Sequence, residues 1–184
     1  MIPHSFTSEG FVLARRNFGE ADRIIDVYSK EKGKISLIAK GVRRPKSRKR
    51  GHIEVFSRVN FQAVSGKGID IMTEAEMIDN YKEIRQSLKK ISLAYYFMEV
   101  IGKITHESEI NIRVYELLSV SLEKLRNTIF LKKLRLEFVK NLIIILGFWP
   151  ENKVLPDIDE KLEEILERQI FSNRVGKRVL SNVK

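Results

Sequence analysis

Two different spacings of hydrophobic residues divide the chain near residue 80. Before that point, apolar and polar positions alternate, as in Ile35, Leu37 and Ala39. This period of two is typical of half-buried strands. Turn-like segments such as "SKEKGK" and "SGKG" separate the alternating stretches. The pattern predicts five short strands, near 11–14, 21–28, 35–40, 55–64 and 69–77, and such a set favours a small barrel or a sandwich.

After Tyr81 the hydrophobic residues are spaced by three and four, which predicts amphipathic helices. The predicted helices cover 84–101, 110–125, 131–145 and a shorter segment at 158–169. Gly147 and Pro150 are placed to end the third helix. The predicted fold class is therefore β + α in two domains. A five-stranded β domain occupies 1–80, and an all-α helical domain occupies 81–184.

Charge and cysteine content narrow the possible functions. The chain has 184 residues, with 34 Lys and Arg against 24 Asp and Glu, for a formal net charge of +10. Such an excess favours a polyanionic partner: nucleic acid, an acidic protein tail or an anionic membrane face. The absence of cysteine excludes disulfides and thiolate zinc sites. The N-terminus lacks a signal-peptide pattern, and the longest apolar run, Leu142–Leu146, is too short to span a bilayer. We expect a soluble, cytoplasmic protein.

Residues that commonly support catalysis do not form a recognisable motif. His4, His52 and His106 are far apart and have no metal-ligand spacing. Asp157, Asp159 and Glu160 could suggest a metal-dependent nuclease. However, they stand at a predicted helix start, where acidic residues complement the helix dipole. We therefore expect a binding protein without catalytic residues, metal or cofactor.

The most concentrated charge lies between two predicted strands. Six of the eight residues from Arg43 to Arg50 are Lys or Arg. A solvated charge run is the simplest interpretation, but this run joins strands of a folded domain and is broken by Pro45 and Ser47. Together with neighbouring cations it could line a groove for a phosphate backbone. The candidate nucleic-acid-binding residues are Arg15, Arg16, Arg23, Lys40, Arg43, Arg44, Lys46, Arg48, Lys49 and Arg50.

Base stacking would additionally require exposed aromatic side chains beside this run. The candidates are Phe18, Tyr28 and Phe56, each of which could equally belong to the core. Nothing in the sequence resembles a helix that reads base edges, so little sequence specificity is expected.

The stretch "GFVLARRNFGEADRIIDVYSKEKGKISLIAKGVRRPKSRKRGHIEVFS" resembles the N-terminal domain of the RecO family of bacterial recombination mediators. The segment "LRLEFVKNLIIILGFWPE" resembles the family more loosely. The resemblance implies an N-terminal OB-fold barrel followed by a helical domain. It also implies DNA repair and recombination: binding of single- and double-stranded DNA, annealing of complementary strands and, with RecR, help in loading RecA onto DNA covered by single-strand-binding protein (SSB). Such a protein would be nucleoid-associated.

This chain departs from the family at one place. Many members carry a four-cysteine zinc module after the segment that here reads "LGFWP", whereas this chain has "ENKVLPD" without cysteine. A zinc site is therefore not implied. The acidic C-terminal tail of SSB would suit cations on the third predicted helix, although a plain solvated face is the simpler interpretation. Those candidate partner-binding residues are Lys132, Lys133, Arg135 and Lys140. A protein-interaction adaptor with an acidic partner and an RNA-binding OB-fold protein remain the alternatives.

Overall fold

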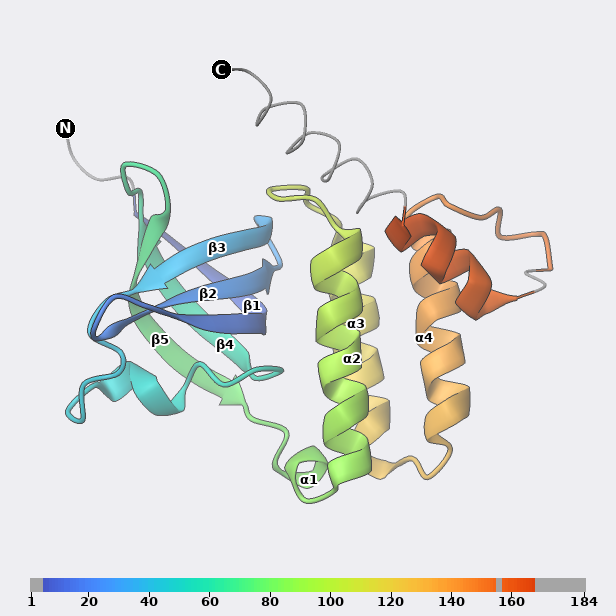
Figure 1. The fold of residues 1–184 in the computed structure, drawn as a ribbon, viewed down its shortest axis with the longest axis horizontal. Coiled ribbons are helices and arrows are strands. Elements are labelled where there is room, and N and C mark those ends of the chain that lie inside the picture. The colour runs from blue at the N-terminus through green and yellow to red at the C-terminus, as the bar shows by residue number, and fades with distance from the viewer. Residues whose placement is uncertain (1–4, 155–156, 168–184) are drawn as a thin grey trace, which may run out of the picture. The chain divides into compact units, whose positions relative to one another are not determined.

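The computed structural model describes residues 5–154 and 157–167, without the side chains of Arg48 and Arg50 (Figure 1). The chain divides into two compact units, Met1–Leu131 and Lys132–Lys184. The change from strand to helix predicted near residue 80 falls inside the first unit. The proposed domain boundary at 80/81 therefore lies between two parts of one compact unit, and the division into domains at 1–80 and 81–184 stays a prediction.

The first part of unit 1 is a closed five-stranded barrel. Its strands are β1 (Ser5–Phe18), β2 (Asp22–Ser29), β3 (Gly33–Ala39), β4 (Arg58–Val64) and β5 (Asp70–Asp79). They follow one another around the barrel in the order β1-β2-β3-β5-β4, and β1 closes the barrel by pairing with β4. The pairs are antiparallel except β3 with β5, which is a short parallel pair. This is the five-stranded Greek-key arrangement of the OB-fold, so the predicted fold class is confirmed.

The apolar residues of the alternating pattern fill the barrel interior. Residues that alternate along the strands point inward, and two loop residues, Val42 and Ile53, join them in one buried cluster. The other members of this cluster are Val12, Ile25, Val27, Leu37, Ala39, Val59, Phe61, Ala63 and Met72. Because Val42 and Ile53 flank the basic run, the loop between β3 and β4 is anchored to the core at both ends. A short 3₁₀ helix, η1 (Arg48–Gly51), lies within this loop.

Helices of unit 1 pack on the barrel. They are α1 (Lys82–Arg85), α2 (Leu88–Ile104) and α3 (Ile112–Asn127). Lys34 of β3 donates to the carbonyl of Gly102 in α2 at 2.9 Å. Gly33 has a φ of +67°, and a Cβ there would lie 2.1 Å from the carbonyl oxygen of Glu109. The β2–β3 turn therefore needs glycine both for its backbone conformation and for close contact with the α2–α3 connection.

The single helix predicted at 84–101 is interrupted in the structure. Gln86 and Ser87 separate α1 from α2, and Leu88, which fits the predicted apolar spacing, is 79% exposed. The helices predicted at 110–125 and 131–145 are present, as α3 and as α4 (Leu131–Ile145). The α4 helix ends as predicted at Gly147, whose φ is +78°, with Phe148 N donating to the carbonyl of Ile143 at 3.0 Å. Helix is also present at 158–167.

Candidate nucleic-acid interface

The loop between β3 and β4, which we call the basic loop, is hydrogen-bonded to the turn between β1 and β2. The amide of Gly41 donates to Oδ1 of Asp22 at 2.7 Å, and the amide of Arg43 donates to the carbonyl of Ala21 at 2.9 Å. Gly41 has a φ of +64°, so the chain reverses sharply as it leaves β3. These bonds fix the backbone of the first loop residues against the β1–β2 hairpin.

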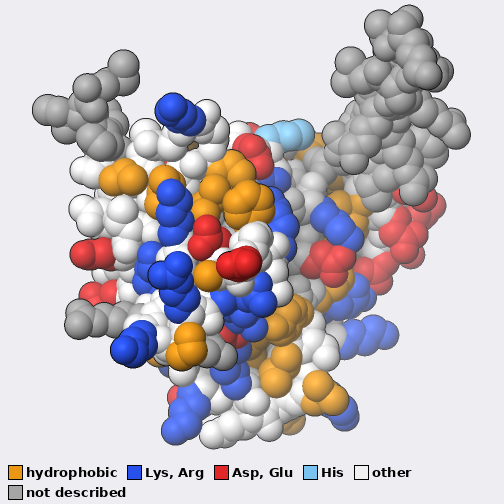
Figure 2. Space-filling view, turned by 60° about the vertical axis from the view of Figure 1, so that its left-hand side comes forward, with side chains coloured by type: hydrophobic (Ala, Val, Ile, Leu, Met, Phe, Trp, Pro, Cys, Tyr) orange, Lys and Arg blue, Asp and Glu red, His pale blue; other side chains and the backbone are white. Residues whose placement is uncertain are grey.

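Four candidate cations project from this fixed segment. Lys40, Arg43, Arg44 and Lys46 are exposed. Among the described side chains, no carboxylate forms an ion pair with Lys40, Arg44 or Lys46, and Arg43 Nη1 makes only a long contact of 3.4 Å with the carbonyl of Gly19. Figure 2 shows Lys and Arg side chains following one another over the barrel side of the molecule, with some Asp and Glu among them. We name Lys40, Arg43, Arg44 and Lys46 the loop cluster.

The cations on the strands are more constrained than the loop cluster. Arg16 forms a 3.0 Å ion pair with Asp26, but its side chain remains 58% exposed. Arg15 is half-buried and pairs with Glu54. Arg23 is half-buried and donates to Asn17 Oδ1 at 3.3 Å across the β1–β2 pair. β1 ends and β2 begins at the turn to which the basic loop is hydrogen-bonded. The structure therefore brings most of the predicted residues to one end of the barrel.

Lys49 has a structural contact that the sequence did not predict. Its Nζ donates to the carbonyl of Met72 in β5 at 3.0 Å, and burial lowers the pKa of this amine below its usual value. The bond fastens η1 to the barrel, and a phosphate would have to replace it. The side chains of Arg48 and Arg50 lie outside the described part of the chain.

The structure separates the three candidate aromatics. Tyr28 is 1% exposed, and its hydroxyl donates to the carbonyl of Asn111 at 3.3 Å. Phe56 is fully buried, with a φ of +58°, under the guanidinium of Arg85 at 3.9 Å from the ring centre. A stacking role for these two is therefore wrong. Phe18, at the end of β1, is 49% exposed.

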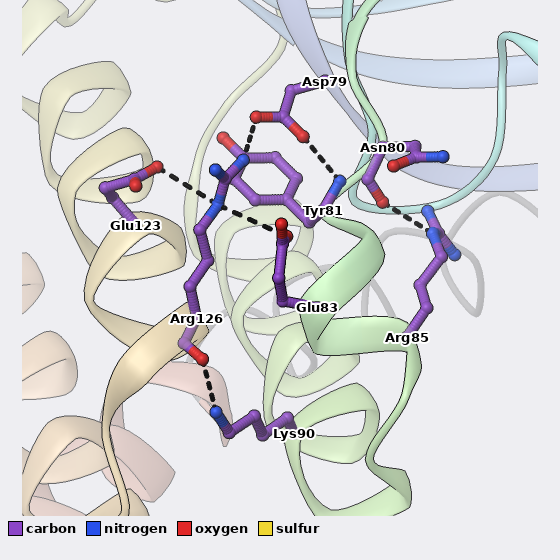
Figure 3. A network of polar contacts seen from close by, with 8 residues as sticks. All are labelled: Asp79, Asn80, Tyr81, Glu83, Arg85, Lys90, Glu123 and Arg126. Atoms are coloured by element: carbon purple, nitrogen blue, oxygen red, sulfur yellow. Dashed lines mark hydrogen bonds and ion pairs between the residues drawn. The ribbon is translucent and has the colours of Figure 1, made fainter.

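Arginines that were not singled out from the sequence connect the barrel to the helices (Figure 3). Arg126 of α3 pairs with Asp79 at the end of β5, lies 3.3 Å from a carboxylate oxygen of Glu123 and stacks over Tyr81 at 4.8 Å. Arg85 donates to the carbonyl of Val55 at 2.9 Å. These contacts hold the barrel and helices together, and only the three-dimensional structure reveals them.

The candidate partner-binding residues lie on α4 in the second unit. Lys132, Lys133 and Lys140 are exposed, and Lys133 is 4.0 Å from Glu137. Arg135 instead forms a bidentate ion pair with Asp159, in which Nη1 and Nη2 donate to Oδ1 and Oδ2 at 2.6 and 2.8 Å. Hydrogen bonding from Arg135 lowers the pKa of Asp159. Arg135 is thus engaged within its own unit.

Several of the residues considered for catalysis have structural contacts. Asp157 Oδ1 accepts from the amides of Asp159 and Glu160 at 2.9 and 3.0 Å, as a helix-capping side chain does. His52 Nδ1 accepts from the amide of Met77 at 3.0 Å, whereas His4 lies outside the described residues. Within 5–154 and 157–167, His, Asp and Glu side chains form no group of three that could hold a metal ion. No helix in those ranges is long and apolar enough to cross a membrane.

An OB-fold barrel with a cationic loop at one end belongs to a class of domain that binds oligonucleotides and oligosaccharides in many proteins. The family described as "Recombination protein O N terminal" matches residues 1–81. The chain carries the RecO N-terminal domain and is similar to RecO proteins beyond it. It is 31% identical over 160 residues to the DNA repair protein RecO of Dehalococcoides mccartyi. The aligned region covers 87% of this chain and 63% of that protein. It is 40% identical over 89 residues to the DNA repair protein RecO of Rubrobacter xylanophilus, covering 48% of this chain and 36% of that protein. The chain therefore spans less than two thirds of the length of these curated relatives.

Proposed function

We propose that this protein acts in DNA repair by binding single- and double-stranded DNA and annealing complementary strands. The observation that carries the proposal is the loop cluster on an OB-fold: four exposed cations on a backbone segment hydrogen-bonded to the β1–β2 hairpin. A phosphate backbone supplies negative charges in series and matches such a cluster. The names of the curated relatives, DNA repair protein RecO, support this assignment.

Annealing by this surface needs neither an acid–base pair nor a metal. Two strands repel each other through their phosphates, and Lys and Arg side chains reduce this repulsion while base pairs form. Arg16 and Arg23 extend the cationic surface beyond the loop cluster along β1 and β2. The candidate phosphate contacts are therefore the loop cluster together with Arg16 and Arg23, while Arg15 and Lys49 hold the surrounding structure in place through Glu54 and Met72.

The proposed partners are RecR, SSB and, through them, RecA, in the cytoplasm at the nucleoid. The exposed amines of Lys132, Lys133 and Lys140 on α4 suit the acidic SSB tail by charge. Charge reversal by Lys132→Glu with Lys133→Glu is expected to weaken binding of an SSB-tail peptide in a titration. Unchanged binding would leave α4 as a solvated face.

The proposal is tested by titrating the protein with fluorescent oligonucleotides across a salt series and by following annealing of complementary strands, with and without SSB. We expect tight binding at low salt that weakens steeply as salt rises, and faster annealing. An adaptor for an acidic protein would instead show weak binding that does not depend on oligonucleotide length. An RNA-binding protein would bind RNA of the same sequence more tightly than DNA.

A further inference from the structure

Among the described residues of the barrel, 5–79, Phe18 is the most exposed Phe or Tyr side chain. It is 49% exposed, whereas Phe11, Tyr28, Phe56 and Phe61 are at most 1% exposed. A single exposed hydrophobic side chain is common on protein surfaces and needs no special explanation. The surroundings of Phe18 are what set it apart.

Phe18 occupies a firmly held position at the tip of the β1–β2 hairpin. It pairs with Asp22 in the strand register, next to the pair of Asn17 with Arg23. Asp22 in turn accepts the amide of Gly41. The ring is therefore carried by the tip of a hairpin whose strands pair with each other and whose residues Ala21 and Asp22 are hydrogen-bonded to the basic loop.

The space around this tip is open, and cations flank it. A Cβ placed on Gly19, the next residue, would have no atom within 4 Å. Arg43 contacts the turn through both its amide and its guanidinium, at Ala21 and Gly19. Phosphates held by Arg43 and its neighbours would thus bring nucleobases close to a flat apolar ring.

We propose that Phe18 is a base-stacking residue through which the DNA-binding surface prefers unpaired bases over duplex DNA. This inference rests on the proposed DNA binding. Bases of a single strand have free faces that can stack on an aromatic ring, whereas bases within a duplex already stack on their neighbours. Phe18 then supplies a contact that single strands gain and duplexes lack, while the loop cluster serves both.

The test compares an oligo(dT) with an abasic oligomer of the same length, since both carry the same phosphates. Fluorescence anisotropy at one fixed low salt concentration gives both affinities. We expect the wild type to bind oligo(dT) about fivefold or more tightly than the abasic strand, from the lower end of measured base–aromatic stacking. Phe18→Ala should remove this preference without changing abasic binding, and Phe18→Trp should keep it.

Phe130→Ala is the matched control, because Phe130 is 67% exposed in the loop between α3 and α4. It should bind both strands as the wild type does. Equal loss of preference in Phe18→Ala and Phe130→Ala would overturn the inference. A wild type that binds both strands equally would also overturn it, while leaving the proposed DNA binding intact. Absence of binding to either strand would instead reject the proposed function together with the inference.

Discussion

The loop cluster makes a quantitative prediction about salt dependence. Replacing Arg43, Arg44 and Lys46 with Gln removes three exposed positive charges but keeps a polar side chain at each position. Only Arg43 has a described side-chain contact, the 3.4 Å approach to Gly19. We therefore expect the free energy of unfolding to stay within about 0.5 kcal/mol of wild type, as for most surface substitutions.

The size of the effect follows from counterion release. The slope of log affinity against log salt is about −0.9 per duplex phosphate contacted and about −0.7 per single-strand phosphate. Three lost contacts should make the slope less steep by about 2.7 on duplex and about 2.1 on single strands. Between about 50 and about 200 mM salt, the wild type should therefore lose about 40-fold more duplex affinity than the variant, and about 20-fold more on single strands.

The matched control changes net charge equally at other sites. Lys82, Lys89 and Arg113 are exposed residues of α1, α2 and α3. Their replacement with Gln also removes three charges, and we expect the slope to stay near that of the wild type. Anisotropy titrations at four or five salt concentrations measure both slopes. Equal changes in the two variants would refute the reasoning, because net charge rather than the loop cluster would then set the affinity.

Three other residues give predictions that separate structural from binding roles. Lys49→Met should lower stability by about 1 kcal/mol through loss of the bond to the Met72 carbonyl, and leave the salt slope unchanged; a slope less steep by about 0.9 would mean that Lys49 contacts phosphate. Arg126→Met should lower the free energy of unfolding by about 2 to 3 kcal/mol in denaturant titrations, because the Asp79 carboxylate is left without its charged partner; a loss below about 0.5 kcal/mol would contradict this. Burial raises the pKa of Glu9, but hydrogen bonds from Tyr115 and Arg58 outweigh burial and bring it below the usual 4.5. The ionised carboxylate therefore stabilises the fold above that pH, and this stabilisation is lost as acid protonates Glu9. Glu9→Gln should be less stable than wild type near neutral pH, and the difference in the free energy of unfolding should vanish in acid. A difference that persists in acid would contradict this assignment.

The strands could be predicted from the sequence because residues of barrel strands alternate between core and solvent. The prediction failed where polar residues are buried. Ser8 is 5% exposed and bonds to the buried Ser29 hydroxyl at 2.6 Å. Such positions look like loop in the sequence, so β1 was predicted at 11–14 but begins at Ser5. Conversely, Val55 and Phe56 continue the alternation but precede β4, because Phe56 adopts a positive φ that hydrophobic pattern does not encode.

The sequence predicted the candidate site only from its concentration of positive charge. Composition indicates which residues are cationic, but the role of each depends on what the folded chain places beside it. Lys46 and Lys49 are three residues apart, yet one is exposed and the other donates to a β5 carbonyl. The same holds for Phe18 and Phe56, since alternation could not tell which ring lies in the core. These distinctions arise from the barrel register and from contacts between distant segments.

The hydrogen bonds of Gly41 and Arg43 explain why a folded domain carries so much like charge in one connection. Side chains within about 8 to 10 Å of each other repel at physiological salt, so an untethered loop would separate its cations. Here Val42 is buried and the flanking amides are bonded to the β1–β2 hairpin, so core packing holds the cations near one another. The backbone is then ordered before any ligand arrives, and binding need not supply that ordering entropy. Under the proposed function, phosphates that approach the loop would relieve this repulsion, an advantage that a flexible basic tail would not provide.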